Sequence, residues 1–481
     1  MLFNSWQFAV FLPIVFGLYW ALPHKYRQPV LLISSYYFYM SWNFKYVVLI
    51  LFTTAVSYTA AVLVERTGKH EKRKLLLAAT LVACLGVLFI FKYFNFFMGS
   101  LAAAAQRFAI PLHPTTLKLL LPVGISFYTF QTLSYVIDVY RGDVAAERNF
   151  FTYALFVSFF PQLVAGPIER TKNLLPQLKA EHTFGYDQAM YGLKLMVWGY
   201  FKKLVVADNL AVFVDRVFND VYTYRGFALV LAAFFFTIQI YCDFSGYSDI
   251  ARGTAKLLGI DLMENFKSPY FSASIHEFWS RWHISLSTWF RDYVYIPLGG
   301  NRVSKARHYW NLLLTFLVSG LWHGANWTFV IWGGVHGAAQ VVENALGLRR
   351  ESKRGSLVWW LRVVMVFCFA MLAWVLFRAQ TLDEAVYVFA HMLDGIKDPA
   401  QYVFRGIKTD GIHRYDLLAF LLYLPVLILC DYLCVRKKTD VIQWMADEKK
   451  PFQWLFYIYL GCAIVVLSYK NIGGEFIYFQ F

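Results

Sequence analysis

Two histidines lie in an apolar stretch of the sequence, GLWHGANWTFVIWGGVHG, which covers residues 320–337. An ionisable side chain is costly in hydrocarbon, so an imidazole kept in such a stretch is a candidate for function. Burial lowers the pKa of histidine, and a neutral imidazole is a common general base. Gly320 and Gly324 flank His323 and would let a substrate or a second backbone approach closely. We therefore interpret His323 as a candidate base, with a structural hydrogen bond to a neighbouring helix as the alternative.

The second histidine, His336, follows 13 residues after His323 and has glycines on both sides. Thirteen helical residues span about 20 Å, so the two rings should not bind one metal ion unless the helix breaks. We expect His336 to be structural. Asn326 lies between the two histidines and could form a hydrogen bond close to His323.

Two carboxylates, Asp243 and Asp249, lie near the end of another apolar run in QIYCDFSGYSDIARG (239–253). Their spacing matches neither an EF-hand loop nor a zinc site, so we expect no metal. Either acid could orient a base, pair with a cation or cap a helix, and we favour pairing or capping. The sequence also lacks GxSxG, HExxH and Walker motifs, which argues against a metalloprotease or an ATP-driven pump.

The composition indicates what must position these residues. The chain has 481 residues, of which 59% are hydrophobic and 16% are charged, against about 25% charged in soluble domains. The sequence predicts an all-α, polytopic integral membrane protein with roughly ten to twelve transmembrane helices. We treat residues 1–481 as one membrane domain with its catalytic core at about 120–345. The apolar runs are 7–22, 46–64, 75–91, 151–165, 186–206, 227–242, 310–322, 325–342, 357–377, 381–393, 416–434 and 454–469.

The core region contains segments that do not read as simple crossings. Prolines and glycines interrupt residues 120–143 and 159–178, which predicts re-entrant segments around an internal site. Residues 275–302 are too charged to span the membrane, but their apolar side chains have the spacing of one amphipathic helix. Glu277 and Arg281 are four residues apart and can pair on its polar face. We expect this helix to lie at the cytoplasmic surface or to fold back into the protein.

The net charge of +15 is concentrated in short clusters at 65–74, 349–354, 436–438 and 449–450. In a membrane protein, lysine and arginine are retained on the cytoplasmic side, so we place these loops in the cytoplasm and expect no nucleic-acid partner. The six cysteines are scattered, mostly within apolar runs. They read as packed free thiols.

Several long motifs resemble the membrane-bound O-acyltransferase family, and within it the alginate O-acetyltransferase branch. Most of the resemblance lies in EFWSRWHISLSTWFRDYVYIPLGGNR (277–302) and in GLWHGANWTFVIWGGVHG. Further segments are SFYTFQTLSYVIDVYRGD, FFPQLVAGPIER, DFSGYSDIARG, MENFKSPY and the C-terminal FIYFQF. The resemblance covers nearly the whole chain. It implies a helical core around a central funnel, with His323 as the catalytic histidine and His283 as the second histidine of the family motif.

The same resemblance implies an activity. An acetyl group would be taken from a cytoplasmic thioester, acetyl-CoA being the expected donor substrate, with no bound cofactor. It would cross the bilayer of the bacterial inner membrane to an extracytoplasmic SGNH-type acetyltransferase that modifies an exported polysaccharide such as alginate. Two alternatives stay open: D-alanyl transfer to teichoic acid from a carrier protein, and a transporter that moves a substrate without bond chemistry.

Roles for individual residues follow from this activity. His323 would take the proton of the acceptor and activate it for attack on the thioester. Asn326 or Ser319 would donate to the oxyanion. His283 and Asp292 would shape the donor entrance. The phosphates of coenzyme A would be attracted by Arg281, Arg291 and Arg302.

Overall fold

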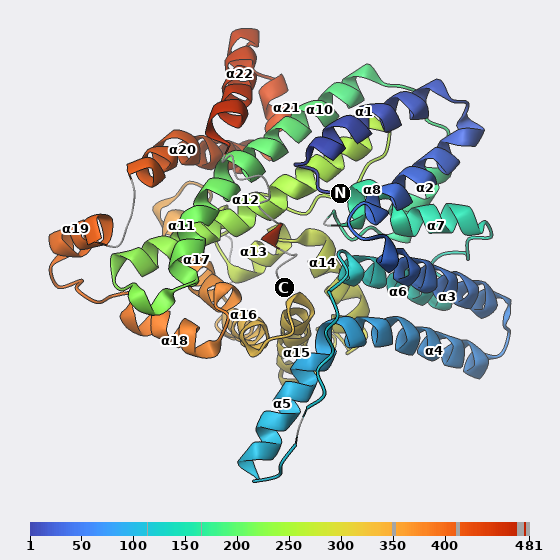
Figure 1. Ribbon diagram of the computed structural model, residues 1–481, viewed down its shortest axis with the longest axis horizontal. Coiled ribbons are helices and arrows are strands. Elements are labelled where there is room, and N and C mark those ends of the chain that lie inside the picture. Colours follow the sequence, from blue (N-terminus) through green and yellow to red (C-terminus); the bar gives the residue numbers. More distant parts are fainter. Residues whose placement is uncertain (113, 165, 349–352, 410–413, 469–475, 478–481) are drawn as a thin grey trace. The chain divides into compact units, whose positions relative to one another are not determined.

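The computed structural model describes residues 1–112, 114–164, 166–348, 353–409, 414–468 and 476–477, which form helices and connecting turns with no strand among them (Figure 1). Part of the predicted cytoplasmic loop 349–354 and residues 478–481 of the C-terminal motif therefore lie outside the described residues. The chain divides into two compact units. Unit 1 contains residues 1–193 and 251–263, and unit 2 contains residues 194–250 and 264–481.

Unit 1 is a group of helices built mostly from residues 1–193. Its elements are α1 (Trp6–Ala21), α2 (His24–Met40), η1 (Phe44–Tyr46), α3 (Val47–Arg66), α4 (His70–Leu88), η2 (Phe89–Tyr93), α5 (Phe94–Arg107), α6 (Ile125–Arg141), α7 (Phe150–Ser158), α8 (Phe160–Leu163) and α9 (Thr171–Lys179). The predicted interruption in 120–143 is confirmed, because α6 begins only after Gly124. This glycine has φ +76°, and a Cβ there would lie 2.7 Å from the carbonyl oxygen of Leu163.

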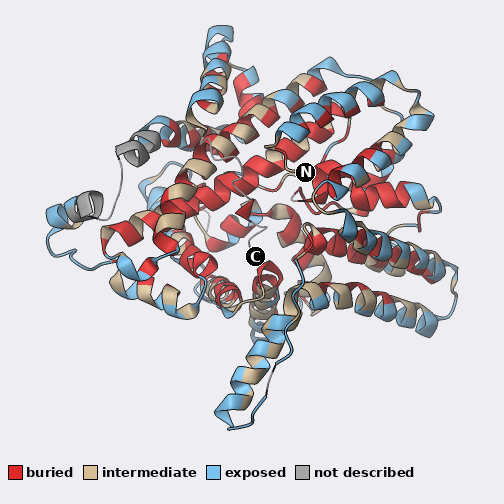
Figure 2. Ribbon diagram, viewed as in Figure 1, coloured by how far each residue is buried: buried red, intermediate tan, exposed pale blue. Residues whose placement is uncertain are grey.

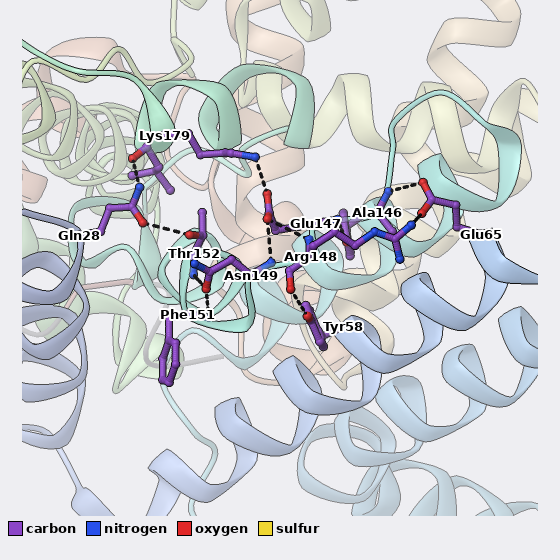
Figure 3. Close-up of polar contacts among 12 residues, drawn as sticks. Gln28, Tyr58, Glu65, Ala146, Glu147, Arg148, Asn149, Phe151, Thr152 and Lys179 are labelled. Atoms are coloured by element: carbon purple, nitrogen blue, oxygen red, sulfur yellow. Dashed lines mark hydrogen bonds and ion pairs between the residues drawn. The ribbon is translucent and has the colours of Figure 1, made fainter. Parts of the chain in front are cut away.

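A buried carboxylate, Glu147, organises the connection between α6 and α7 (Figure 3). It accepts hydrogen bonds from the backbone N–H groups of Arg148 and Asn149, both 2.9 Å, and from the Lys179 ammonium of α9 at 2.9 Å. Burial alone would raise the pKa of Glu147, but the Asn149 amide and the Lys179 ammonium outweigh it and hold the pKa below its ordinary value. The ionised carboxylate therefore stabilises this corner of unit 1.

We expect Glu147→Gln to destabilise unit 1 by about 1.5–3 kcal/mol at neutral pH, because the donors around this side chain lose their charged acceptor and the glutamine NH2 group cannot accept from any of them. The depressed pKa means that this contribution is present above the unfolded pKa of about 4.3 and is lost as the pH falls through the folded value. Thermal unfolding of wild type and variant in detergent at pH 7 and pH 4 measures it. Glu181→Gln, at an exposed glutamate between α9 and α10 (Tyr186–Tyr200), is the control. An equal gap between wild type and Glu147→Gln at both pH values would contradict this account.

Unit 2 contains the remaining elements. They are η3 (Phe201–Ala207), α11 (Asp208–Phe218), η4 (Val221–Thr223), η5 (Pro269–Phe271), α13 (Ile275–Arg281), α14 (Ile284–Phe290), η6 (Arg291–Tyr295), α15 (Lys305–His323), α16 (Trp327–Ala345), α17 (Leu357–Arg378), α18 (Leu382–His391), α19 (Pro399–Thr409), α20 (Arg414–Lys437), α21 (Val441–Ala446) and α22 (Lys450–Leu467). Two helices, α10 (Tyr186–Tyr200) and α12 (Phe227–Leu257), run from one unit into the other.

The predicted all-α, multi-pass membrane class is confirmed. Five helical segments among the described residues are long and apolar enough to cross a bilayer: 44–66, 70–107, 227–257, 357–378 and 450–467. They differ in how far they are buried within the protein. In 227–257, 78% of the apolar window is buried, whereas in 70–107 only 17% is buried (Figure 2). Other predicted runs form shorter helices, such as α7 with nine residues and α18 with ten. The figure of ten to twelve crossings stays a prediction.

The single amphipathic helix predicted for 275–302 is wrong. Two short helices, α13 and α14, replace it, and the chain turns at Trp282 and His283 between them. The predicted apolar stripe is nevertheless buried from Ile275 to Phe290, and Arg281 pairs with Glu277 at 2.7 Å as expected. The segment is therefore folded into unit 2 by its apolar face.

Candidate functional site

Helices α15 and α16 approach each other closely at two glycines. A Cβ on Gly320 would lie 2.2 Å from the carbonyl oxygen of Phe329, and a Cβ on Gly333 would lie 2.2 Å from that of Phe316. Neither contact tolerates a larger residue, so both positions require glycine. This packing holds the end of α15 against the start of α16, and His323 is the last residue of α15.

His323 is buried in an aromatic cage supplied by three helices of unit 2. Its ring centroid lies 5.0 Å from that of Trp322, 5.1 Å from that of Trp332 on α16 and 5.4 Å from that of Phe377 on α17. The last two rings meet it edge to face, at 88° and 71°. Edge-to-face packing of this kind restricts the ring to one orientation. His323 is thus a preorganised group in an apolar environment.

His283 occupies the turn between α13 and α14 and has a left-handed backbone, with φ 44° and ψ 55°. Asn265 supports this turn: its backbone oxygen accepts from the Ile284 amide at 3.0 Å, and its side-chain oxygen accepts from the Ser285 amide at 3.3 Å. The His283 side chain is fully buried against Phe244, with ring centroids 4.6 Å apart. Burial lowers the pKa of His283 from its ordinary value to about 3, so its ring is neutral at neutral pH.

The structure brings the two sequence-predicted histidines together. The ring centroids of His283 and His323 lie 6.3 Å apart, and Trp322 contacts both rings. A neutral imidazole can accept a proton from a hydroxyl and return it to a leaving group, while a second imidazole nearby can orient a reactant by hydrogen bonding. The pair is therefore equipped for acid–base catalysis.

Asn326, one of the two oxyanion candidates of the sequence, has other hydrogen-bond partners. The Asn326 side chain caps α16 by accepting from the Thr328 amide at 3.1 Å, and its nitrogen donates to the carbonyl of Gln380 at 2.7 Å. Its amide is thus used at both ends in holding the α15–α16 turn. Ser319 lies one turn before His323 on α15 and is buried. The oxyanion role of either residue stays a prediction.

The three arginines predicted to attract the phosphates of the donor differ in how exposed they are. Besides its pair with Glu277, Arg281 donates to the carbonyl of Lys267 at 3.3 Å and is partly buried. Arg291 is exposed and pairs with Asp292 at 2.8 Å. Arg302 is exposed in the turn after η6. Arg291 and Arg302 are therefore open to an anionic ligand, whereas Arg281 is held in structural contacts.

Asp243 and Asp249 take part in buried ion pairs, as the sequence suggested. Lys203 of η3 pairs with Asp243 and, at 2.9 Å, with Asp208. Lys202 pairs with Asp249 at 2.6 Å. These two lysines were not among the residues predicted from the sequence, although two adjacent lysines inside the apolar run 186–206 are a signal of buried ion pairs.

The remaining potential ligands are dispersed. No group of three or more His, Cys, Asp or Glu side chains that could hold a metal ion occurs in the part of the chain that the structure describes. All six cysteines are free thiols. Three of them are buried, as predicted for packed thiols, whereas Cys368 and Cys462 are exposed.

The chain is similar in sequence to several known membrane proteins. The sequence model of the membrane-bound O-acyltransferase family matches residues 145–382. A probable alginate O-acetylase of Pseudomonas putida is 40% identical over 496 residues, which cover 100% of both chains. One of Azotobacter vinelandii is 44% identical over 82% of this chain and 78% of its own. The peptidoglycan O-acetyltransferase of Helicobacter pylori is 33% identical over 100% of this chain and 98% of its own.

Proposed function

The chain belongs to the membrane-bound O-acyltransferase family, and from this premise we propose that it transfers acetyl groups from acetyl-CoA for the O-acetylation of an exported polysaccharide such as alginate. It is a multi-pass membrane O-acyltransferase. Beyond this class, we propose the identity of the donor, the identity of the polymer and the passage of the acetyl group across the membrane. End-to-end similarity to a probable alginate O-acetylase is the observation that carries it.

The buried histidine pair gives the transfer a chemical route. The acceptor hydroxyl approaches the imidazole of His323, which takes its proton as the oxygen attacks the thioester carbonyl carbon. The carbon–sulfur bond then breaks, and the departing thiolate of coenzyme A receives the proton from His323. His283, neutral and 6.3 Å away between ring centroids, orients one of the two reactants. The aromatic cage excludes water, which would otherwise hydrolyse the thioester.

The proposed activity requires a location in the membrane, a path for the donor and a partner that accepts the acetyl group. The protein resides in the bacterial inner membrane with its basic loops in the cytoplasm, where acetyl-CoA is made. A funnel through the helical core leads the donor to His323. An extracytoplasmic SGNH-type acetyltransferase receives the acetyl group and passes it to the polymer.

A donor comparison tests the proposed function. Purified protein in detergent receives acetyl-CoA or a D-alanyl carrier protein, together with the candidate partner, and release of free thiol and of acylated partner is measured. We expect acetyl-CoA to be consumed. Turnover of the D-alanyl carrier alone would favour the teichoic acid alternative. Uptake of acetyl-CoA into proteoliposomes without cleavage would favour a transporter.

The exposed arginines of 275–302 give a second test of the donor. We expect Arg291→Ala and Arg302→Ala each to raise the KM for acetyl-CoA by about twofold to fivefold, since an exposed ionic contact contributes up to about 1 kcal/mol. The kcat should stay near its wild-type value, and added salt should reproduce the change by screening the phosphates.

Arg225→Ala is the matched control, because Arg225 is an equally exposed arginine that pairs with Asp394 outside this segment. Its KM should not change. An unaltered KM in both Arg291→Ala and Arg302→Ala, measured per folded protein, would remove these side chains from the donor site.

A further inference from the structure

Helix α13, which leads into His283, is attached to α16 at two buried points. The carboxylate of Glu343 accepts from the backbone amides of Ile275 and His276, at 2.7 and 2.9 Å, and so holds the first turn of α13. One turn further on, the Trp279 indole donates to Nδ1 of His336 at 3.2 Å. His336 and Glu343 lie seven residues apart and present the same face of α16 to α13.

The Trp279–His336 bond fixes the state of the imidazole. An indole nitrogen can only donate, so Nδ1 of His336 must be the acceptor and the neutral ring carries its hydrogen on Nε2. The ring is fully buried and contacts Phe369 edge to face, with centroids 5.2 Å apart. In this orientation Nδ1 accepts from Trp279 while the ring packs against Phe369.

The fully buried indole of Trp332 packs between the Trp279–His336 hydrogen bond and His323. Its ring centroid lies 4.9 Å from that of His336 on the same helix, α16, and 5.1 Å from that of His323 at the end of α15. It also lies 5.7 Å from that of Trp279. A movement of the His336 ring must therefore displace Trp332, which is one wall of the cage around His323.

The Trp279–His336 hydrogen bond also affects the position of His283, because Trp279 and His283 are close in the sequence. Trp279 is four residues before His283, and only the end of α13 and Trp282 separate them. Loss of the bond would leave α13 attached to α16 through Glu343 at its start, and would remove its hydrogen bond to α16 near the end that leads into His283. The expected consequence is a change in the separation of the two imidazoles and not the unfolding of α13.

We infer that His336 is a positioning residue of the acyltransferase, which sets the separation of His283 and His323 by holding Trp279 on one side and Trp332 on the other. The inference rests on the proposed function, because it assigns the two positioned histidines to that reaction. His336 itself contacts no reactant in this account.

A double-mutant cycle of Trp279→Phe and His336→Leu tests the coupling. We expect each single variant to lower kcat by about tenfold to a hundredfold, the range that a misplacement of about 1 Å produces, with the KM for acetyl-CoA nearly unchanged. The double variant should be no worse than the poorer single variant. His336→Asn, which is similar in size to leucine but keeps an acceptor near the position of Nδ1, should recover much of the lost kcat. Additive losses, or no difference between the Asn and Leu variants, would overturn the inference.

A second readout does not depend on activity. Spin labels at Ser280→Cys and Ala325→Cys, in a protein without its native cysteines, report the distance between α13 and the end of α15. We expect a narrow distribution in the wild type and in His336→Asn, and a broad or shifted one in His336→Leu. An unchanged distribution in His336→Leu would overturn the positioning role. A wild type that cleaves no thioester, while the distances respond as expected, would instead contradict the proposed function.

Discussion

Replacing His323 with alanine is expected to lower the rate of acyl transfer by about 10²- to 10⁴-fold, the usual contribution of a general base. The packing of the aromatic cage explains why the substitution should lower the rate of transfer and leave the fold intact. Trp332 and Phe377 pack on one another as well as on His323, with ring centroids 5.2 Å apart, so the helices that carry them stay in contact. Initial rates of thiol release from acetyl-CoA, normalised to the amount of monodisperse protein, measure the loss.

The structural alternative for His323 makes a different prediction. If the ring only filled the cage, His323→Phe would preserve much of the packing and most of the rate, whereas a general base would be lost in both variants. His391→Ala is the matched control, because His391 is a histidine of unit 2 whose ring pairs with Asp394. It should retain the wild-type rate. A near-normal rate in His323→Ala would exclude the general-base role.

Local sequence signals were sufficient for the class of protein and for the main helices of the site. Hydropathy and composition place α15 and α16, and an imidazole in an apolar run singles out His323 without any tertiary information. The break at His283 had no comparable signal. The periodicity of 275–293 continues through it, and the left-handed turn depends on Asn265, which is distant in the sequence and supplies acceptors to the first amides of α14.

For the polar contacts inside the fold, the sequence indicated which residues need a partner but not which residue the partner is. Asp243 and Asp249 were recognisable as acids that need partners, but the partners come from η3, some 40 residues earlier. Similarly, His336 was expected to be structural, yet its link to Trp279 depends on how α13 folds back on α16. In each case the partner is fixed by packing between helices and not by spacing within one helix.

Replacing Lys203 with methionine is expected to reduce the free energy of unfolding by about 3–5 kcal/mol, the usual cost of removing one partner of a buried ion pair. Lys203 is 3% exposed, and its ammonium pairs with both Asp208 and Asp243. Methionine fills a similar volume, so the loss would come from two carboxylates left without their cation. Against a total stability of about 5–15 kcal/mol, much of the protein should fail to fold.

The loss should also spread beyond the pair. The other oxygen of Asp243 accepts from the backbone amide of Ile477 at 2.9 Å, and the next residue, Phe244, packs on His283. Heating in detergent followed by size-exclusion chromatography measures the fraction that stays folded. Lys437→Met, at the exposed pair with Glu448, is the control and should behave like wild type. Asp243→Asn added to Lys203→Met should recover part of the stability, because one uncompensated charge is removed. If Lys203→Met unfolds at the wild-type temperature, the buried pair does not stabilise this unit and the charge must be neutralised in another way.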